Sequence, residues 1–202
     1  MTKLLQQIIL QTLCLFAYFA NAQSVGIGNF YDHLPYHNGN SLCISKDKIY
    51  VASGQGIFTY DLSDNSLETY SKVNKLSDLG VSSIAYSEKH NSVIIGYTTG
   101  NIDVIVNNQV VNIPDIKRTS IQGFKSINEI LIQEDFAFLS AGFGIVKLDI
   151  QRKEIKETYF IGDNGTNVFV NDLTFFKDSI YAVTNSGIYV ANQDNSNLAN
   201  FQ

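Results

Sequence analysis

A glycine that recurs at a nearly constant interval constrains the fold of this chain more than any other sequence feature. Each of these glycines follows an apolar residue by six positions and is followed within two residues by a second apolar run. The four glycines, which are 44, 44 and 43 residues apart, are Gly56, Gly100, Gly144 and Gly187. A period of roughly 20–50 residues indicates a repeat architecture in which each repeat is one supersecondary unit.

Each repeat contains short apolar runs that are separated by clusters of turn residues, and none shows a sustained helical period. The runs that precede the glycine segments are residues 42–44, 84–86, 130–132 and 173–175. In the first three repeats a further run follows, at residues 67–70, 110–113 and 155–159, whereas only residues 193–202 follow the third run of the fourth repeat. Four short strands in about 44 residues are typical of a β-propeller blade.

We therefore predict an all-β fold, a β-propeller with four-stranded antiparallel blades of about 44 residues. Middle strands of stacked blades are covered on both faces, so they are expected as continuous apolar runs such as residues 93–95 and 136–139. The four repeated glycines are expected in the turn between the second and third strands, where a positive φ is needed. This role is structural.

The predicted blades do not add up to a complete ring. Three full blades and part of a fourth occupy the chain, and propellers close with about 4–8 blades. A four-blade ring would require residues 24–32 to supply the missing outer strand. The sequence favours the other alternative, an incomplete propeller that stops partway round a larger ring, and it leaves the number of blades in the complete ring open.

The first residues have the pattern of an export signal. A short cationic start and an apolar stretch are followed by a small-x-small motif that ends at Ala22. We predict a signal peptide over residues 1–22, cleaved between Ala22 and Gln23, and a propeller domain over residues 23–202. A membrane anchor is the weaker alternative, because glutamines interrupt the apolar run. The protein is expected to pass the inner membrane and to reach the periplasm or the outer cell surface, with no membrane span after signal removal.

Composition excludes several classes of protein. With 45% hydrophobic residues the chain can bury a core, so global disorder is excluded. There are 14 Lys and Arg against 19 Asp and Glu, a net charge of −5, and no basic stripe that would suit nucleic acid. Signal removal would leave Cys43 as the single thiol, expected as a small buried side chain rather than a nucleophile.

The sequence does not predict a catalytic, cofactor or metal site. His33 and His37 are four residues apart, but Pro35 lies between them and prevents the helix on which that spacing would join two ligands. His90 lies in a polar turn and is expected to be solvated. The Gly-x-Gly pairs lack the following helix and third glycine of a nucleotide-binding loop.

The long connections between blades are the predicted interaction loops, because function in such folds lies in loops. They are residues 73–80, 114–124 and 162–168. The second connection carries a small basic spot of Lys117 and Arg118, with Lys125 nearby. This spot is expected as a solvated loop, with contact to an anionic glycan or lipid as the alternative.

Segments of the first two repeats resemble a known family. They are residues 29–36 (NFYDHLPY), 48–61 (KIYVASGQGIFTYD), 75–86 (KLSDLGVSSIAY) and 94–103 (IIGYTTGNID). Together they are similar to the N-terminal propeller of PorZ, a component of the type IX secretion system of Bacteroidetes. The resemblance covers about residues 28–202. The hairpins also resemble, more loosely, two-component regulator propeller repeats.

The resemblance implies a non-enzymatic scaffold without cofactors. Its implied partners are type IX secretion and sortase proteins, which process secreted cargo and attach it to lipopolysaccharide, and lipopolysaccharide itself. An alternative is a periplasmic sensor propeller of a hybrid two-component regulator, which would sense a glycan fragment. A third reading, a propeller lyase or hydrolase, would need a convergent acid and base cluster that the sparse His and Arg content does not favour.

Overall fold

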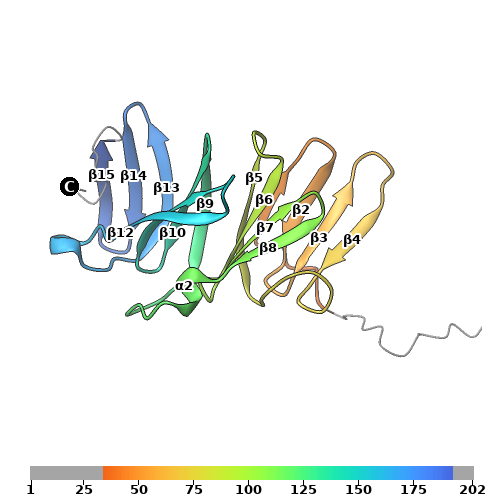
Figure 1. Ribbon diagram of the computed structural model, residues 1–202, viewed down its shortest axis with the longest axis horizontal. Helices are drawn as coiled ribbons and strands as arrows, with labels where there is room; N and C mark the ends of the chain where they lie inside the picture. Colours follow the sequence, from red (N-terminus) through yellow and green to blue (C-terminus); the bar gives the residue numbers. More distant parts are fainter. Residues whose placement is uncertain (1–33, 193–202) are drawn as a thin grey trace, which may run out of the picture. The chain divides into compact units, whose positions relative to one another are not determined.

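The chain forms a series of small antiparallel sheets, each built from consecutive strands. The computed structural model describes residues 34–192, which lie in one compact unit of residues 32–202. Among these residues there are three four-stranded sheets and one three-stranded sheet (Figure 1). In every sheet the strands lie in sequence order. This meander is the blade of a β-propeller, so the predicted all-β class and four-stranded blades are confirmed.

The strands coincide closely with the apolar runs of the sequence. Blade 1 contains β1 (Ser41–Ile44), β2 (Lys48–Ala52), β3 (Ile57–Asp61) and β4 (Leu67–Tyr70). Blade 2 contains β5 (Val81–Ser87), β6 (Ser92–Tyr97), β7 (Ile102–Val106) and β8 (Gln109–Ile113). Blade 3 contains β9 (Ile127–Gln133), β10 (Phe136–Ala141), β11 (Gly144–Asp149) and β12 (Glu154–Tyr159). Blade 4 contains β13 (Val170–Phe176), β14 (Ser179–Thr184) and β15 (Gly187–Asn192).

Two short helical segments lie in the connections between blades of the described region. They are α2 (Asp115–Arg118) and the 3-10 turn η1 (Asp163–Gly165). The sequence did not predict α2, because a helix of four residues is too short to show apolar periodicity. The acidic residue in the first turn of α2 and the two basic residues in its last turn suit the dipole of this helix. Within α2, the side chain of Ile116 is buried.

The hydrophobic core consists of three layers, one between each pair of neighbouring blades. Val93 and Ile95 of β6 pack toward blade 1, whereas Ile94 of the same strand packs toward blade 3. In blade 3, Leu139 packs toward blade 2 and Phe138 toward blade 4. The middle strands are thus buried on both faces, which confirms the expectation drawn from their continuous apolar runs.

The four described blades form an open row. The first strands are neighbours, with β1 beside β5, β5 beside β9, and β9 beside β13, and blades 1 and 4 lie at the two ends (Figure 1). Apolar side chains are exposed at these ends, including Leu42 (62%) of β1 and Ile188 (67%) of β15. This arrangement agrees with the predicted incomplete propeller.

The repeated glycines lie where the chain passes from the second to the third strand of each blade: Gly56 and Gly100 are in the turn, and Gly144 and Gly187 are the first residues of β11 and β15. Gly100, Gly144 and Gly187 have φ angles of 80°, 152° and 135°. Gly56 corrects the expectation of a positive φ at every repeat, because the left-handed residue of the first turn is Gly54, with φ 75°. At Gly56 the constraint is space, since a Cβ atom would lie 2.6 Å from the carbonyl oxygen of Tyr70.

Some sequence predictions fall outside the described residues. They are the signal peptide over residues 1–22 with its cleavage between Ala22 and Gln23, His33, and the segment 24–32 considered as an outer strand. Within residues 34–192, no helix has the length and apolar character needed to cross a bilayer.

Candidate interaction surface

The strand order places the long connections between blades at one end of the blades. We call this the connection end, formed by residues 71–80, 98–101, 114–126, 142–143 and 160–169. Each connection is tied to the turn between the second and third strands of a blade. The amide of Val81 donates to the carbonyl of Gly54 at 3.0 Å, and that of Gly142 donates to Ser126 at 2.9 Å. All three predicted interaction loops therefore lie on this end.

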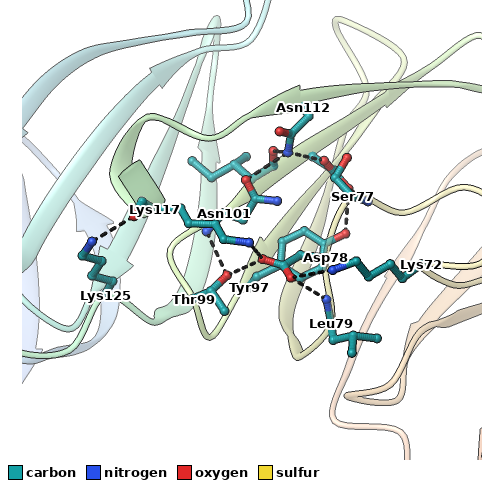
Figure 2. A network of polar contacts seen from close by, with 12 residues as sticks. Lys72, Ser77, Asp78, Leu79, Tyr97, Thr99, Asn101, Asn112, Lys117 and Lys125 are labelled. Atoms are coloured by element: carbon teal, nitrogen blue, oxygen red, sulfur yellow. Dashed lines mark hydrogen bonds and ion pairs between the residues drawn. The ribbon is translucent and has the colours of Figure 1, made fainter. Parts of the chain in front are cut away.

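A buried carboxylate, Asp78, joins two of these connections (Figure 2). Its Oδ2 atom lies 2.5 Å from Nζ of Lys117, at α2, and 2.7 Å from the hydroxyl of Thr99. Its Oδ1 atom accepts from the amide of Leu79 at 2.9 Å and lies 3.7 Å from Nζ of Lys72. The blade 1–2 connection is thus bonded directly to the blade 2–3 connection.

The environment of Asp78 favours its ionised form. Burial alone would raise the pKa of this carboxyl, but hydrogen bonds from Lys117, Thr99 and the Leu79 amide outweigh burial and hold the pKa below its usual value. Asp78 is consequently a fixed negative charge between two lysines, and it holds Lys117 against the protein surface.

A second buried carboxylate, Asp103 of β7, binds the blade 1–2 connection to blade 2. It is fully buried and accepts from the hydroxyl of Tyr97 at 2.6 Å, the amide of Ser77 at 2.9 Å and Nδ2 of Asn112 at 2.9 Å. Burial, with the charge of Asp103, raises the pKa of the Tyr97 hydroxyl. Three donors from different elements therefore meet one carboxylate, which fixes residues 76–78 on the blade.

The basic spot of the sequence is more ordered than expected for a solvated loop. Lys117 pairs with Asp78, and Lys125 donates to the carbonyls of Lys117 at 2.9 Å and Thr119 at 2.6 Å, where α2 ends. Arg118 is exposed, and its guanidinium has no hydrogen-bond or ion-pair partner among residues 34–192. Arg118 is thus the cation that the connection end leaves available.

A groove of about 480 Å³ opens on the connection end beside α2. Its floor is apolar, with Phe143, Phe160 and Ile155 among its lining residues, and its rim includes Gln122 and Asn167. The rings of Phe143 and Phe160 are 6.1 Å apart. The predicted loops 114–124 and 162–168 form its two sides, joined by a 2.7 Å hydrogen bond from Nδ2 of Asn167 to the carbonyl of Gln122.

The opposite end, formed by tight turns, is held by a different ionic cluster. Nε2 of His90 lies 2.9 Å from Asp135 Oδ1, and Nζ of Lys89 lies 2.8 Å from Asp135 Oδ2. Only 15% of the His90 side chain is exposed. The expected solvated His90 is therefore wrong, because this side chain links blade 2 to blade 3.

The thiol of Cys43 and the metal-ligating side chains are the remaining chemistry-bearing groups that the sequence raised. Cys43 is buried as expected, and burial raises the pKa of its thiol to about 12, which disfavours a nucleophilic thiolate. Within residues 34–192, no three His, Cys, Asp or Glu side chains come together in a way that could hold a metal ion.

We expect the contribution of Asp78 to stability to depend on pH. Because its folded-state pKa is lowered, the contribution is present above the unfolded-state pKa of about 4 and is lost as pH falls through the folded value. Asp78→Asn should cost about 1–3 kcal/mol at pH 7, and the difference from the parent protein should shrink below pH 4. Urea unfolding at several pH values measures it.

Thr99→Val is the matched control for this experiment, because it removes a neutral donor from the same carboxylate at 2.7 Å. This variant should be less stable than the parent protein at neutral pH. On acidification it should lose nearly as much stability as the parent protein does, because the carboxylate is still present. A constant difference between Asp78→Asn and the parent protein from pH 7 to pH 2.5 would contradict the assigned ion pairing.

The sequence profile of the family described as the PorZ N-terminal β-propeller domain of the type IX secretion system matches residues 49–202. The chain belongs to the PorZ N-terminal β-propeller family. The family match begins within β2 of blade 1 and includes blades 2 to 4 and the whole connection end. No curated protein sequence matches the chain.

Solved structures agree with this membership. PorZ of Porphyromonas gingivalis, an essential surface component of the type IX secretion system, is 26% identical over 83% of this chain, with a TM-score of 0.71. This chain spans only 22% of that PorZ chain. The extracellular domain of BT4673 from B. thetaiotaomicron is 16% identical over 86% of this chain and 23% of its own, with a TM-score of 0.67, which shows the fold alone.

Proposed function

We propose that this PorZ-family propeller is a non-enzymatic scaffold of type IX secretion, exported to the periplasm or the outer cell surface. In this role it would bind proteins of the sortase assembly and thereby support the processing of cargo and its attachment to lipopolysaccharide. The observation that carries the proposal is the family match over residues 49–202. The location is supported by the description of P. gingivalis PorZ as a surface component.

The connection end has the properties of a protein-binding surface. Buried carboxylates hold its loops, so a partner would meet a largely pre-formed surface and lose little entropy in ordering it. The groove offers an apolar pocket with two aromatic rings, surrounded by amides that can satisfy a partner's polar groups. Aromatic anchors in such pockets dominate the binding energy of protein interfaces.

The chemistry of the groove favours a partner segment with an apolar side chain beside acidic residues. The apolar side chain would pack against the exposed ring of Phe160 on the groove floor, and the acidic residue would meet Arg118 of the neighbouring α2, outside the lining of the groove. Anionic groups of lipopolysaccharide are the second partner proposed for Arg118, because its guanidinium has no competing partner among the described residues.

Co-purification from outer membranes tests the proposal. The full chain, carrying an affinity tag, should retain the sortase, and Gln122→Trp should reduce the amount retained at least about tenfold, as expected when an anchor pocket is filled. Gln122 lines the groove and is exposed, so this substitution blocks the groove without removing a packed side chain.

Phe176→Trp is the matched control, because Phe176 is exposed by 59% and lies in β13 beside a turn at the opposite end. It should leave the retained sortase unchanged. Failure of the parent protein to retain any sortase would overturn the scaffold proposal and favour the sensor alternative, and equal effects of both substitutions would overturn the assignment to the connection end.

A further inference from the structure

A second cleft, of about 230 Å³, lies between blades 1 and 2 at the turn end. Blade 1 contributes Tyr50 of β2, and blade 2 contributes Tyr86 and three asparagines in two turns. Its floor includes the buried side chains of Val93 and Ile105. The cleft is distinct from the connection end and from the groove described above.

The hydroxyl of Tyr50 is the unusual feature of this cleft. Among residues 34–192, four tyrosines are buried, and three of them donate to a carboxylate: Tyr70 to Glu68, Tyr97 to Asp103 and Tyr159 to Glu157. Tyr50 is 8% exposed, yet its hydroxyl has no hydrogen-bond partner in the described part of the chain. The oxygen of this hydroxyl is not among the buried polar atoms that lack a partner, so it opens into the cleft and can both donate to and accept from a ligand there.

The asparagines add free amide groups around this hydroxyl. Asn107 and Asn108 line the cleft, and neither side chain has a hydrogen-bond partner within residues 34–192. Asn91 accepts from the hydroxyl of Tyr86 at 2.8 Å through Oδ1, which leaves its amide hydrogens available. The left-handed backbone at these turns suits asparagine, but glycine would serve that purpose without presenting an amide.

We infer that this cleft binds a neutral sugar residue. None of the residues that line the cleft carries a charge. A charged ligand would lose hydration there without gaining an ion pair, so a neutral ligand is favoured. Its polar groups are hydroxyls and primary amides, which both donate and accept, as the hydroxyls of a sugar do. The apolar floor suits the C–H face of a pyranose ring, and the volume is below the roughly 300–1,000 Å³ of pockets for larger ligands.

Titration of the full chain with uncharged methyl glycosides of glucose, galactose and mannose tests this inference. In ¹H–¹⁵N spectra, at least one glycoside should shift the side-chain amides of Asn107 and Asn108 in a saturable manner. Tyr50→Phe removes only the hydroxyl and should weaken that binding by about three- to tenfold. Since the hydroxyl is unpartnered, the melting temperature of this variant should stay within about 2 °C of the parent value.

Two further variants complete the test. Asn108→Gly keeps the left-handed backbone, whose φ is 61°, and should weaken binding similarly. Tyr60→Phe is the matched control, because Tyr60 donates to Asn65 as Tyr86 donates to Asn91 but does not line the cleft; it should bind like the parent. Absence of any saturable shift, parent-like binding by Tyr50→Phe, or shifts with an uncharged tripeptide but no glycoside would overturn the inference.

Discussion

Replacing Asp103 with alanine is expected to lower the free energy of unfolding by about 2–4 kcal/mol. The substitution removes a fully buried acceptor. The Tyr97 hydroxyl and the Ser77 amide lose this partner, and the Asn112 side chain loses one of its three acceptors. For a domain of this size, the melting temperature should fall by roughly 5–15 °C. Thermal unfolding followed by circular dichroism measures the effect.

Asp64→Ala is the exposed counterpart of this substitution. Asp64 accepts one amide hydrogen bond from Ser66 at 2.9 Å in a solvated hairpin turn, so its loss should cost no more than about 1 kcal/mol. Similar melting temperatures for the two variants would contradict the role assigned to Asp103. Because Asp103 also fixes residues 76–78, Asp103→Ala should expose the blade 1–2 connection to proteolysis before the remainder of the chain.

The second large effect is expected at Gly144. A Cβ atom there would lie 2.2 Å from the carbonyl oxygen of Tyr159, and the φ of 152° is one that other residues rarely adopt. Gly144→Ala must therefore separate β11 from β12 or distort the turn, at a cost of about 3 kcal/mol or more. Soluble yield and melting temperature should both fall.

Gly187→Ala distinguishes the cost of the steric clash with the fourth strand from the cost of backbone strain at a positive φ. Gly187 occupies the equivalent position of blade 4 with a φ of 135°, but no heavy atom of residues 34–192 lies within 4 Å of its Cβ position. Its substitution should cost only the backbone strain, about 1 kcal/mol. Equal losses at Gly144 and Gly187 would show that contact with the fourth strand is not the reason for the repeated glycine.

The blade pattern was predictable because it depends on short-range information. Apolar runs, turn clusters and a spacing of 43–44 residues between glycines recur along the chain, and each blade is a meander of consecutive strands. The conformation of individual turns was less predictable. In the first turn the positive φ occurs at Gly54 and not at Gly56. The sequence has a glycine at both positions, so it does not distinguish which of the two adopts the left-handed conformation.

The connection loops were identified from sequence, but their internal contacts were not. Asp103 carried a usable signal, as a lone acid between the apolar residues Ile102 and Val104 of a predicted strand. Asp78 had none, because a polar residue in a polar loop gives no hint that Lys117, 39 positions later, will contact it. His90 was assigned wrongly for the same reason, since its partner Asp135 lies in the next blade.

Site-specific photocrosslinking in cells tests most directly the central claim that the connection end binds the sortase assembly. A benzoylphenylalanine at Gln122, on the groove, should crosslink the full chain to the sortase. The same group at Lys177, in the β13–β14 turn at the opposite end, should not. Crosslinks to the sortase from Lys177 alone, or from neither position in cells that secrete cargo normally, would contradict the account.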